Sequence, residues 1–257
     1  MTTRIRFLGV AGYEVVGPNH RFLIDPYLTG NPVAPVGPDD LETPDVILVS
    51  HAAWDHLGDT QAIAERTGAP IVCGQDTKAL LVDRGMSEDQ IRPTVTGIVV
   101  EVGGVVVRPV HARHWSMAVL SDGQTVTGVP LGFIVETEPA VRVYHFGDSA
   151  VYGDMRLVGE LYRPTVGLLG CTQPKPLLTR IPGPGSILTG EMNPREAALA
   201  AELLGVDIAV ATHYTDPDDS DVLKFLSLVE SQAGRTGIAL KPGETLVVDG
   251  SSFRREE

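Results

Sequence analysis

The residues best suited to chemistry lie directly after the apolar run Val46–Val49. Two histidines and an aspartate fall within six positions there, as His51, Asp55 and His56. The apolar run predicts a buried strand, so the polar residues follow the point where that strand ends. Imidazole and carboxylate are ligands that zinc, iron and manganese share. This segment therefore predicts a metal site at a strand end.

Three later predicted strands, Val105–Val110, Val141–His145 and Asp207–Ala211, are also followed closely by histidine or aspartate. These residues are His111, His114, Asp148 and His213. A lone histidine at a strand end is usually just a polar rim residue, but the repetition argues against that interpretation here. Strand ends converge on one rim of a sheet, where α/β proteins place their ligands. We therefore expect these side chains to meet the first cluster.

The pattern resembles the metallo-β-lactamase fold superfamily, and within it the branch that includes the ascorbate-6-phosphate lactonase-like proteins. The matching features occur in family order and span most of the chain. They are Ile24-Asp25-Pro26, the box His51–His56, His114-Trp115-Ser116, Gly147-Asp148-Ser149, Thr189–Ala198 and Thr212-His213-Tyr214. The resemblance implies an α/β fold, the αββα sandwich of the metallo-β-lactamase type, and a metal-dependent hydrolase.

One departure from the family pattern bears on the metal count. The family box is His-x-His-x-Asp-His, and Ala53 stands at its second histidine. The resemblance implies two metal sites bridged by Asp148. The first keeps His51 and His114 but lacks a ligand, whereas the second is complete, with Asp55, His56 and His213. A catalytic metal needs about three protein ligands, so we expect one or two ions of Zn²⁺ or Mn²⁺ per chain.

Two hypotheses concern residues beside these ligands. The first site is either empty or completed by His111, three residues before His114. Asp55 and His56 are predicted catalytic residues, because Asp55 can hold the metal and also orient the attacking hydroxide. Tyr214 either donates a hydrogen bond to a developing oxyanion or packs beside the site.

Other polar and aromatic residues near the motifs have two interpretations. Asp25 either orients a metal ligand, as the resemblance implies, or forms the turn before a proline. Asp59 is favoured as a helix cap over a ligand, and His145 is favoured as structural. Trp54 and Trp115 either form a wall of the pocket or only cover the metals from solvent.

The segment Thr172–Leu188 is the main irregular stretch and is rich in proline and glycine. Long loops inside domains are often lids or binding loops. Lys175 and Arg180 within it are candidate clamps for a phosphate or carboxylate of the substrate. The alternatives are a solvated loop or an oligomer contact, so a homo-oligomer is left open.

Composition narrows the class of protein. The 257 residues carry a net charge of −13, which argues against nucleic acid or an anionic membrane as partner. The apolar residues make up 43% of the chain, enough for a core, and no linker divides it, so one domain over 1–257 is expected. Cys73 and Cys171 do not suggest a disulfide framework. With neither a signal peptide nor a membrane span predicted, a cytoplasmic location is expected.

Periodicity and turn residues give the expected elements. The remaining predicted strands are Arg4–Leu8, Tyr13–Val16, Arg21–Ile24, Pro70–Cys73, Ile98–Val102, Gly132–Glu136, Thr165–Leu169, Gly237–Leu240 and Thr245–Val248. The predicted helices are Thr60–Arg66, Asp76–Arg84, Val151–Leu161, Asn193–Leu204 and Asp219–Gln232. Strands followed by helices, repeated in two halves, predict two packed sheets with helices outside.

The sequence thus favours a hydrolase of a small anionic substrate, such as a lactone-like cyclic ester or a related acyl compound. A bound metal lowers the pKa of water toward about 7 and so supplies hydroxide at neutral pH. No Ser-His-Asp or Gly-x-Ser-x-Gly arrangement competes with this mechanism. The alternatives are a phosphodiesterase of the same fold, and a non-catalytic binding protein whose metal site has degenerated at Ala53.

Overall fold

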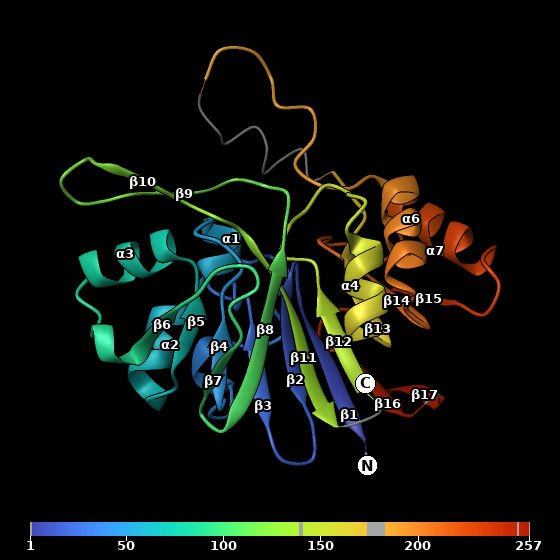
Figure 1. The fold of residues 1–257 in the computed structure, drawn as a ribbon, viewed down its shortest axis with the longest axis horizontal. Coiled ribbons are helices and arrows are strands. Elements are labelled where there is room, and N and C mark those ends of the chain that lie inside the picture. Colours follow the sequence, from blue (N-terminus) through green and yellow to red (C-terminus); the bar gives the residue numbers. More distant parts are fainter. Residues whose placement is uncertain (1, 139–140, 174–182, 251, 257) are drawn as a thin grey trace.

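Two large sheets lie face to face between two groups of helices in the computed structural model (Figure 1), which describes residues 2–138, 141–173, 183–250 and 252–256. The first sheet has eight strands in the order β17-β16-β1-β2-β3-β4-β5-β6. Their bounds are β1 Thr3–Gly9, β2 Gly12–Val16, β3 Arg21–Ile24, β4 Val46–Leu48, β5 Ile71–Cys73, β6 Ile91–Pro93, β16 Thr245–Asp249 and β17 Ser252–Glu256.

The second sheet has seven strands in the order β15-β14-β13-β12-β11-β8-β7. Their bounds are β7 Val100–Val102, β8 Val105–His111, β11 Leu131–Glu138, β12 Val141–His145, β13 Val166–Gly170, β14 Ile208–Thr212 and β15 Thr236–Ile238. The strands β7, β8, β11 and β12 pair antiparallel, as expected, and β12 to β15 pair parallel. A separate hairpin is formed by β9 Ser116–Val119 and β10 Thr125–Gly128.

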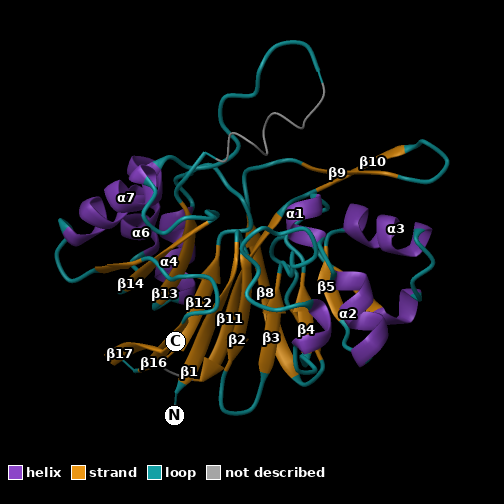
Figure 2. Cartoon of the chain, turned by 180° about the vertical axis from the view of Figure 1, so that it is seen from behind, coloured by secondary structure: helices purple, strands orange, loops and turns teal. Residues whose placement is uncertain are grey.

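Helices cover both outer sides of the pair of sheets, as the view from behind also shows (Figure 2). Beside the first sheet lie α1 Trp54–Leu57, α2 Thr60–Thr67 and α3 Gln75–Asp83, with the 3₁₀ turns Pro38–Asp40 and Glu88–Gln90. Against the second sheet lie α4 Met155–Tyr162, α6 Pro194–Leu204 and α7 Ser220–Glu230. This arrangement confirms the predicted αββα sandwich.

The alternation of side chains along each strand explains why both faces of a sheet are buried. In β4, Val46 and Leu48 belong to the main core between the sheets, whereas Ile47 joins the smaller apolar cluster that includes Ile63 of α2. Successive side chains of a strand point to opposite faces, so an apolar run is buried on both sides. Helix α6 begins as predicted, because Asn193 caps it in a capping box and a proline stands in its first turn.

Several elements differ from the sequence-based expectation. The hairpin β9–β10 and the edge strands β6 and β17 were not predicted, and α4 begins at Met155 rather than Val151. The hairpin exposes Met117 and Val119 to solvent and packs on α3. Its contact with α3 joins it to an earlier part of the chain, which a local sequence pattern does not show. The two cysteines are free and buried, as expected. No helix of the described residues is long and apolar enough to cross a membrane.

Gly147, which follows β12, allows a tight turn against the start of β11, the neighbouring strand of the same sheet. Gly147 has φ +60°, and a Cβ there would lie 1.9 Å from the carbonyl oxygen of Leu131. Gly68 has φ +75° but nothing within 4 Å of such a Cβ. Gly68→Ala should therefore cost only about 1 kcal/mol, for the left-handed backbone. Gly147→Ala should cost at least about 2 kcal/mol more, through the clash.

Chemical denaturation of both variants measures the difference in the free energy of unfolding. Equal losses would show that the turn at Gly147 relaxes without disturbing the sheets.

Candidate metal centre

The predicted ligands meet at one edge of the sandwich, beyond the ends of strands from both sheets. Three groups of buried side chains place one donor atom from each member within 4.8 Å of the others. The groups are His51 with His56 and Asp148, Asp55 with His56 and His213, and Asp148 with Glu191 and His213. The sequence-predicted members Asp55, His56, Asp148 and His213 are thus brought together, as the strand-end argument required.

The ligand box turns sharply after β4. Ala53 is the N-terminal residue before the single-turn helix α1, which carries Asp55 and His56 on its buried side. Gly58 ends this turn at φ +43°, where a Cβ would lie 2.4 Å from the carbonyl oxygen of Pro26. Glycine is therefore required there for the box to fold back over the segment that follows β3.

Asp25 holds His56 from the side away from the cluster. Its Oδ2 lies 2.8 Å from His56 Nδ1 and accepts a 2.7 Å hydrogen bond from the hydroxyl of Ser50, while its Oδ1 accepts one from the amide of Ser50. The carboxylate is completely buried. A carboxylate on one ring nitrogen fixes the tautomer and leaves the other nitrogen for a metal. This geometry favours the orienting role for Asp25.

The backbone is strained at the cluster itself. Among the described residues, five non-glycine positions have positive φ, and Asp25, Asp148 and His213 are three of them, at 44°, 52° and 63°. Such conformations cost of order 1 kcal/mol each and concentrate at functional sites. The amide of His213 donates to the carbonyl of Val10 at 2.7 Å, which helps to hold this turn.

Donor atoms at the centre lack hydrogen-bond partners although they are buried. They are the Nε2 atoms of His51, His56 and His213 and Oδ1 of Asp148. Leaving one buried polar atom unsatisfied costs about 1–3 kcal/mol, so four around one point would be costly without a ligand. Imidazole nitrogens and a carboxylate are the donor set of divalent transition metals. The residues present therefore fit a metal ion.

Asp148 and His51 have the protonation states that a metal ion needs. His56 and His213 would release a proton on binding one, because, although burial opposes this, Asp148 raises the pKa of both rings well above the usual value. Burial works against ionisation of Asp148, but His213 and His56 hold its pKa well below the usual range. Burial, followed by the neighbouring His56, lowers the pKa of His51 to about 3. An ionised carboxylate and a neutral imidazole are the protonation states that metal binding needs.

The first of the two sites implied by the family resemblance, with His51 and His114, lacks a ligand at Ala53. The rings of His51 and His114 lie 5.1 Å apart between centroids, and His114 is half-buried. Ala53 offers no donor. The structure does not bring His111 to the cluster, because β8 continues through this residue, whose exposed ring packs edge-on against Tyr152. The hypothesis that His111 replaces the lost ligand is therefore not supported.

Tyr214 does not face the reacting centre. Its hydroxyl donates to the carbonyl of Leu240 at 2.6 Å and accepts from the amide of the same residue at 2.9 Å. The residue is buried, and its ring packs against Phe7. With its hydroxyl committed to one backbone segment, the predicted oxyanion role of Tyr214 gives way to the packing alternative.

The other residues singled out from the sequence have different surroundings in the structure. Asp59 precedes α2, but its carboxylate accepts from the amides of Leu28 and Thr29 instead of capping that helix. His145 is buried and contacts the carbonyl of Ala11, in keeping with a structural role. Trp54 and Trp115 are 42% and 47% exposed beside the ligands. Lys175 and Arg180 lie outside the described residues.

Glu191 is a site residue that the sequence did not single out. Its Oε1 contacts His213 Nδ1, opposite the nitrogen that faces the cluster, and its carboxylate is buried. Gly170 leaves room for it, since a Cβ there would lie 2.0 Å from Glu191 Oε2. Burial raises the pKa of Glu191 to about 8, although His213 opposes the shift. Its position within Thr189–Ala198, which supported the family resemblance, was the only available signal.

Comparison with known proteins defines the class. A family profile described as "Beta-lactamase superfamily domain" matches residues 20–214, so the chain belongs to the beta-lactamase superfamily. Igni18, a metallo hydrolase from Ignicoccus hospitalis, has a similar structure with a TM-score of 0.76 and 26% identity, covering 97% of this chain and 99% of its own.

Sequence relatives identify the particular family. A UPF0173 metal-dependent hydrolase from Thermococcus onnurineus is 40% identical, covering 95% of this chain and 98% of its own. One from Rubrobacter xylanophilus is 39% identical, covering 82% and 81%. The chain is therefore a member of the UPF0173 family.

The contact between Glu191 and His213 predicts a loss of metal affinity in Glu191→Gln. Glutamine keeps the shape but lacks the negative charge that Glu191 carries above its pKa of about 8, so at pH 9 the metal affinity should fall about 10- to 100-fold. Chelator competition on the purified protein measures this. Glu160→Gln, on the exposed side of α4, is the matched control. Unchanged affinity in Glu191→Gln would assign Glu191 to packing alone.

The placement of two neighbouring histidines predicts opposite outcomes for their removal. His111→Ala should leave the metal content unaltered, because its side chain is exposed away from the cluster. His114→Ala should lower the occupancy of the first site, where it is one of few donors. Elemental analysis compares the metal-to-protein ratios. A loss in His111→Ala equal to that in His114→Ala would contradict the observed geometry.

Proposed function

We propose that the protein is a metal-dependent hydrolase that opens a small anionic cyclic ester or cleaves a related acyl compound. The observation that carries the proposal is the convergence of buried donors from His51, His56, His213 and Asp148. The histidine Nε2 atoms and Asp148 Oδ1 make no hydrogen bond, although Asp148 Oδ2 lies 3.2 and 3.5 Å from two of the rings. The printed names of the UPF0173 relatives, metal-dependent hydrolases, support the same class of reaction.

The residues divide between two positions for a metal. Asp55, His56 and His213 would hold one ion, with Asp148 between it and the position beside His51. When bound, such a metal supplies a Lewis acid and ionises water near neutral pH. Zn²⁺ and Mn²⁺ both suit this mixture of imidazole and carboxylate ligands. The position beside His51 would bind its metal ion more weakly, because Ala53 supplies no donor atom there.

The chain itself orients the reaction. Asp25 and Glu191 fix the rings of His56 and His213, each through its Nδ1. Asp55 is ionised at neutral pH, because His213 and His56 lower its pKa although burial opposes this. One of its oxygens lies 3.7 Å from His213 Nε2, at the margin of the cluster. From there Asp55 can accept a hydrogen bond from an attacking water and so aim it at the substrate carbonyl.

The choice of substrate rests on the surroundings of the ligands and on the family resemblance. Trp54 and Trp115 directly adjoin Asp55 and His114 in the chain and are nearly half exposed. They suit a wall for the apolar part of a small molecule. Lys175 and Arg180 are proposed to meet its negative group. The net charge of −13 favours small substrates over nucleic acid. A cytoplasmic location and a homo-oligomeric state remain predictions.

Two alternatives have specific support. A phosphodiesterase would use the same donor set, since a metal polarises a phosphoryl oxygen as well as a carbonyl. A non-catalytic binding protein is favoured only by Ala53. The donor atoms of the other candidate ligands still lie close together, which argues against a degenerate site. These ligands are Asp55, His56, Asp148 and His213.

The first test is a substrate panel of lactones, cyclic amides, phosphodiesters and β-lactams. We expect turnover of lactones or related acyl compounds that chelator abolishes and Zn²⁺ or Mn²⁺ restores, because the cluster needs a cation to satisfy its donors. Turnover of phosphodiesters alone would replace the acyl proposal. Persistent turnover after complete metal removal would exclude the metal mechanism.

The second test changes the ligand count in both directions. His56→Ala should remove metal and activity, because this ring joins two of the three donor groups. Ala53→His should raise the metal-to-protein ratio by restoring the family ligand. Elemental analysis and thermal unfolding of both variants separate metal loss from unfolding. A metal-free parent protein that cannot be reconstituted would favour the binding-protein alternative.

A further inference from the structure

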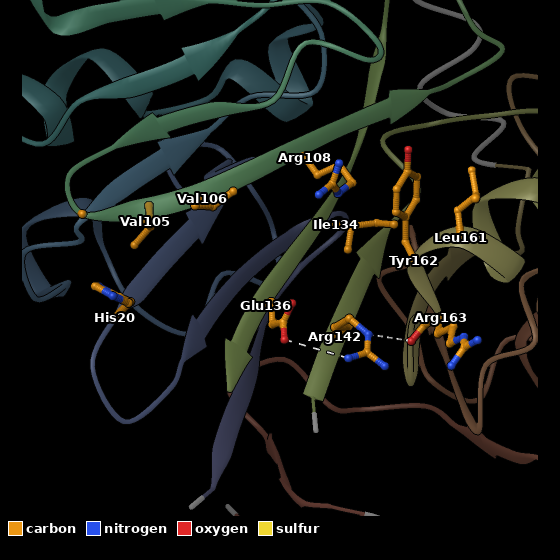
Figure 3. Close-up of a pocket in the computed structure, with 11 residues that line it drawn as sticks. His20, Val105, Val106, Arg108, Ile134, Glu136, Arg142, Leu161, Tyr162 and Arg163 are labelled. Atoms are coloured by element: carbon orange, nitrogen blue, oxygen red, sulfur yellow. Dashed lines mark hydrogen bonds and ion pairs between the residues drawn. The ribbon is translucent and has the colours of Figure 1, made fainter. Parts of the chain in front are cut away.

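A groove lined by arginines lies on the outer face of the second sheet (Figure 3), at the opposite end of β12 from Asp148. Its cavity is about 620 Å³ and is formed by β8, β11, β12 and the end of α4. Arg142 stands near the start of β12 and His145 at its end. They are three residue steps apart along the strand, about 10 Å, and Asp148 lies further on, so the groove is distinct from the metal centre.

Positive charge is concentrated in this groove. Arg108, Arg142 and Arg163 line it together with one acid, Glu136. With three guanidinium groups and one carboxylate, the lining carries a net charge of +2 when His20 is neutral. The whole chain carries −13. A basic groove on an acidic protein selects anions and holds them at short range.

The arginines are fixed in place by their surroundings. The guanidinium of Arg108 lies over the ring of Tyr162, 4.5 Å from its centroid. Arg142 Nε donates to the carbonyl of Arg163 at 2.9 Å, and Glu136 lies 3.9 Å from another nitrogen of Arg142. A stacked guanidinium loses less freedom when it binds, which favours recognition of a planar fork of oxygens.

Arg163 occupies a backbone position that does not suit it. It ends α4 at φ 47°, in the left-handed conformation usually taken by glycine. Its side chain is exposed, so burial does not compensate for the backbone strain. An arginine kept at a position where glycine would fold better indicates that the guanidinium has a use.

The groove also offers apolar surface beside the charge. Val106 and Leu161 are 53% and 60% exposed, and Ile134 lies between Arg108 and Tyr162 in the view of the groove. No helix covers β8 and β11 on this side (Figure 1) within the described parts of the chain. A ligand with both a dianionic group and a compact apolar group matches this lining.

We propose that this groove is a second binding site, separate from the metal centre, for a small organic phosphate. The phosphate would lie beside Arg142 and Arg163, whose guanidinium groups lie near each other at the lower end of the groove in Figure 3 and can bind its oxygens through charge-assisted hydrogen bonds. The organic group would extend toward Tyr162 and Leu161. A cavity of this size falls within the range of small-molecule sites.

The test titrates phenylphosphonate, a phosphate-like dianion that resists hydrolysis, into metal-loaded protein by calorimetry. We expect one saturable site, with inorganic phosphate weaker and phenol weaker still. Arg142→Gln and Arg163→Gly should each lower the affinity about tenfold or more. Arg255→Gln, an exposed arginine on β17 of the other sheet, should leave it unchanged.

Two comparisons keep the result decisive. Arg163→Gly should bind less well without a lower melting temperature, because glycine suits the left-handed backbone, so the lost binding cannot be unfolding. His56→Ala should retain binding if the groove is the site. Binding lost in His56→Ala but kept in both groove variants would assign the anion to the metal centre and overturn the proposal.

Two other outcomes would also overturn it. Weak binding reduced equally by Arg255→Gln would show an adventitious ion only. Self-association of the parent protein that disappears in Arg142→Gln, with no binding of phenylphosphonate, would make the groove an interface between copies of this chain.

Discussion

The metal centre depends on Asp148 standing between two buried histidines. Its Oδ2 lies 3.2 Å from His56 Nε2 and 3.5 Å from His213 Nε2. His56 comes from the box after β4 of the first sheet, whereas Asp148 and His213 follow β12 and β14 of the second. The centre therefore exists only when the two sheets pack, and the apolar layer between them fixes its dimensions.

Several features of the candidate metal centre are unfavourable for folding. Buried donors without partners, ionised carboxylates and left-handed backbone at Asp25, Asp148 and His213 all oppose folding of the isolated chain. The core on both sides of the sheets must compensate for them. A bound cation satisfies the same donors and so adds stability through linkage. The Nδ1 contacts of Asp25 and Glu191 limit the freedom of the two rings before any ligand binds.

The sandwich separates two kinds of chemistry along its strands. The ends of β12 and β14 carry the acidic and imidazole donors, and the opposite end carries the arginines of the groove. Oppositely charged groups placed at one edge would pair with each other and be lost to ligands. Their separation by a rigid sheet leaves each available.

The residue pattern alone is enough to predict the layers and most of the candidate ligands. Period-two and continuous apolar runs predicted the buried strands, and His51, Asp55, His56, Asp148 and His213 followed those runs closely enough to share an edge. Their places at strand ends follow from the local pattern, whereas their burial and proximity also require the two sheets to pack. The lost ligand at Ala53 was equally visible, because it is a matter of residue type.

The contacts of residues whose partners are distant in the chain could be seen only in the folded structure. His111 lies away from the cluster because β8 extends through it and pairs it with Leu131, which the boundary of an apolar run could not show. Tyr214 is committed to Leu240 and Glu191 to His213, across 26 and 22 residues of chain. Such contacts depend on how the two sheets and their loops pack, and no periodicity along the sequence encodes them.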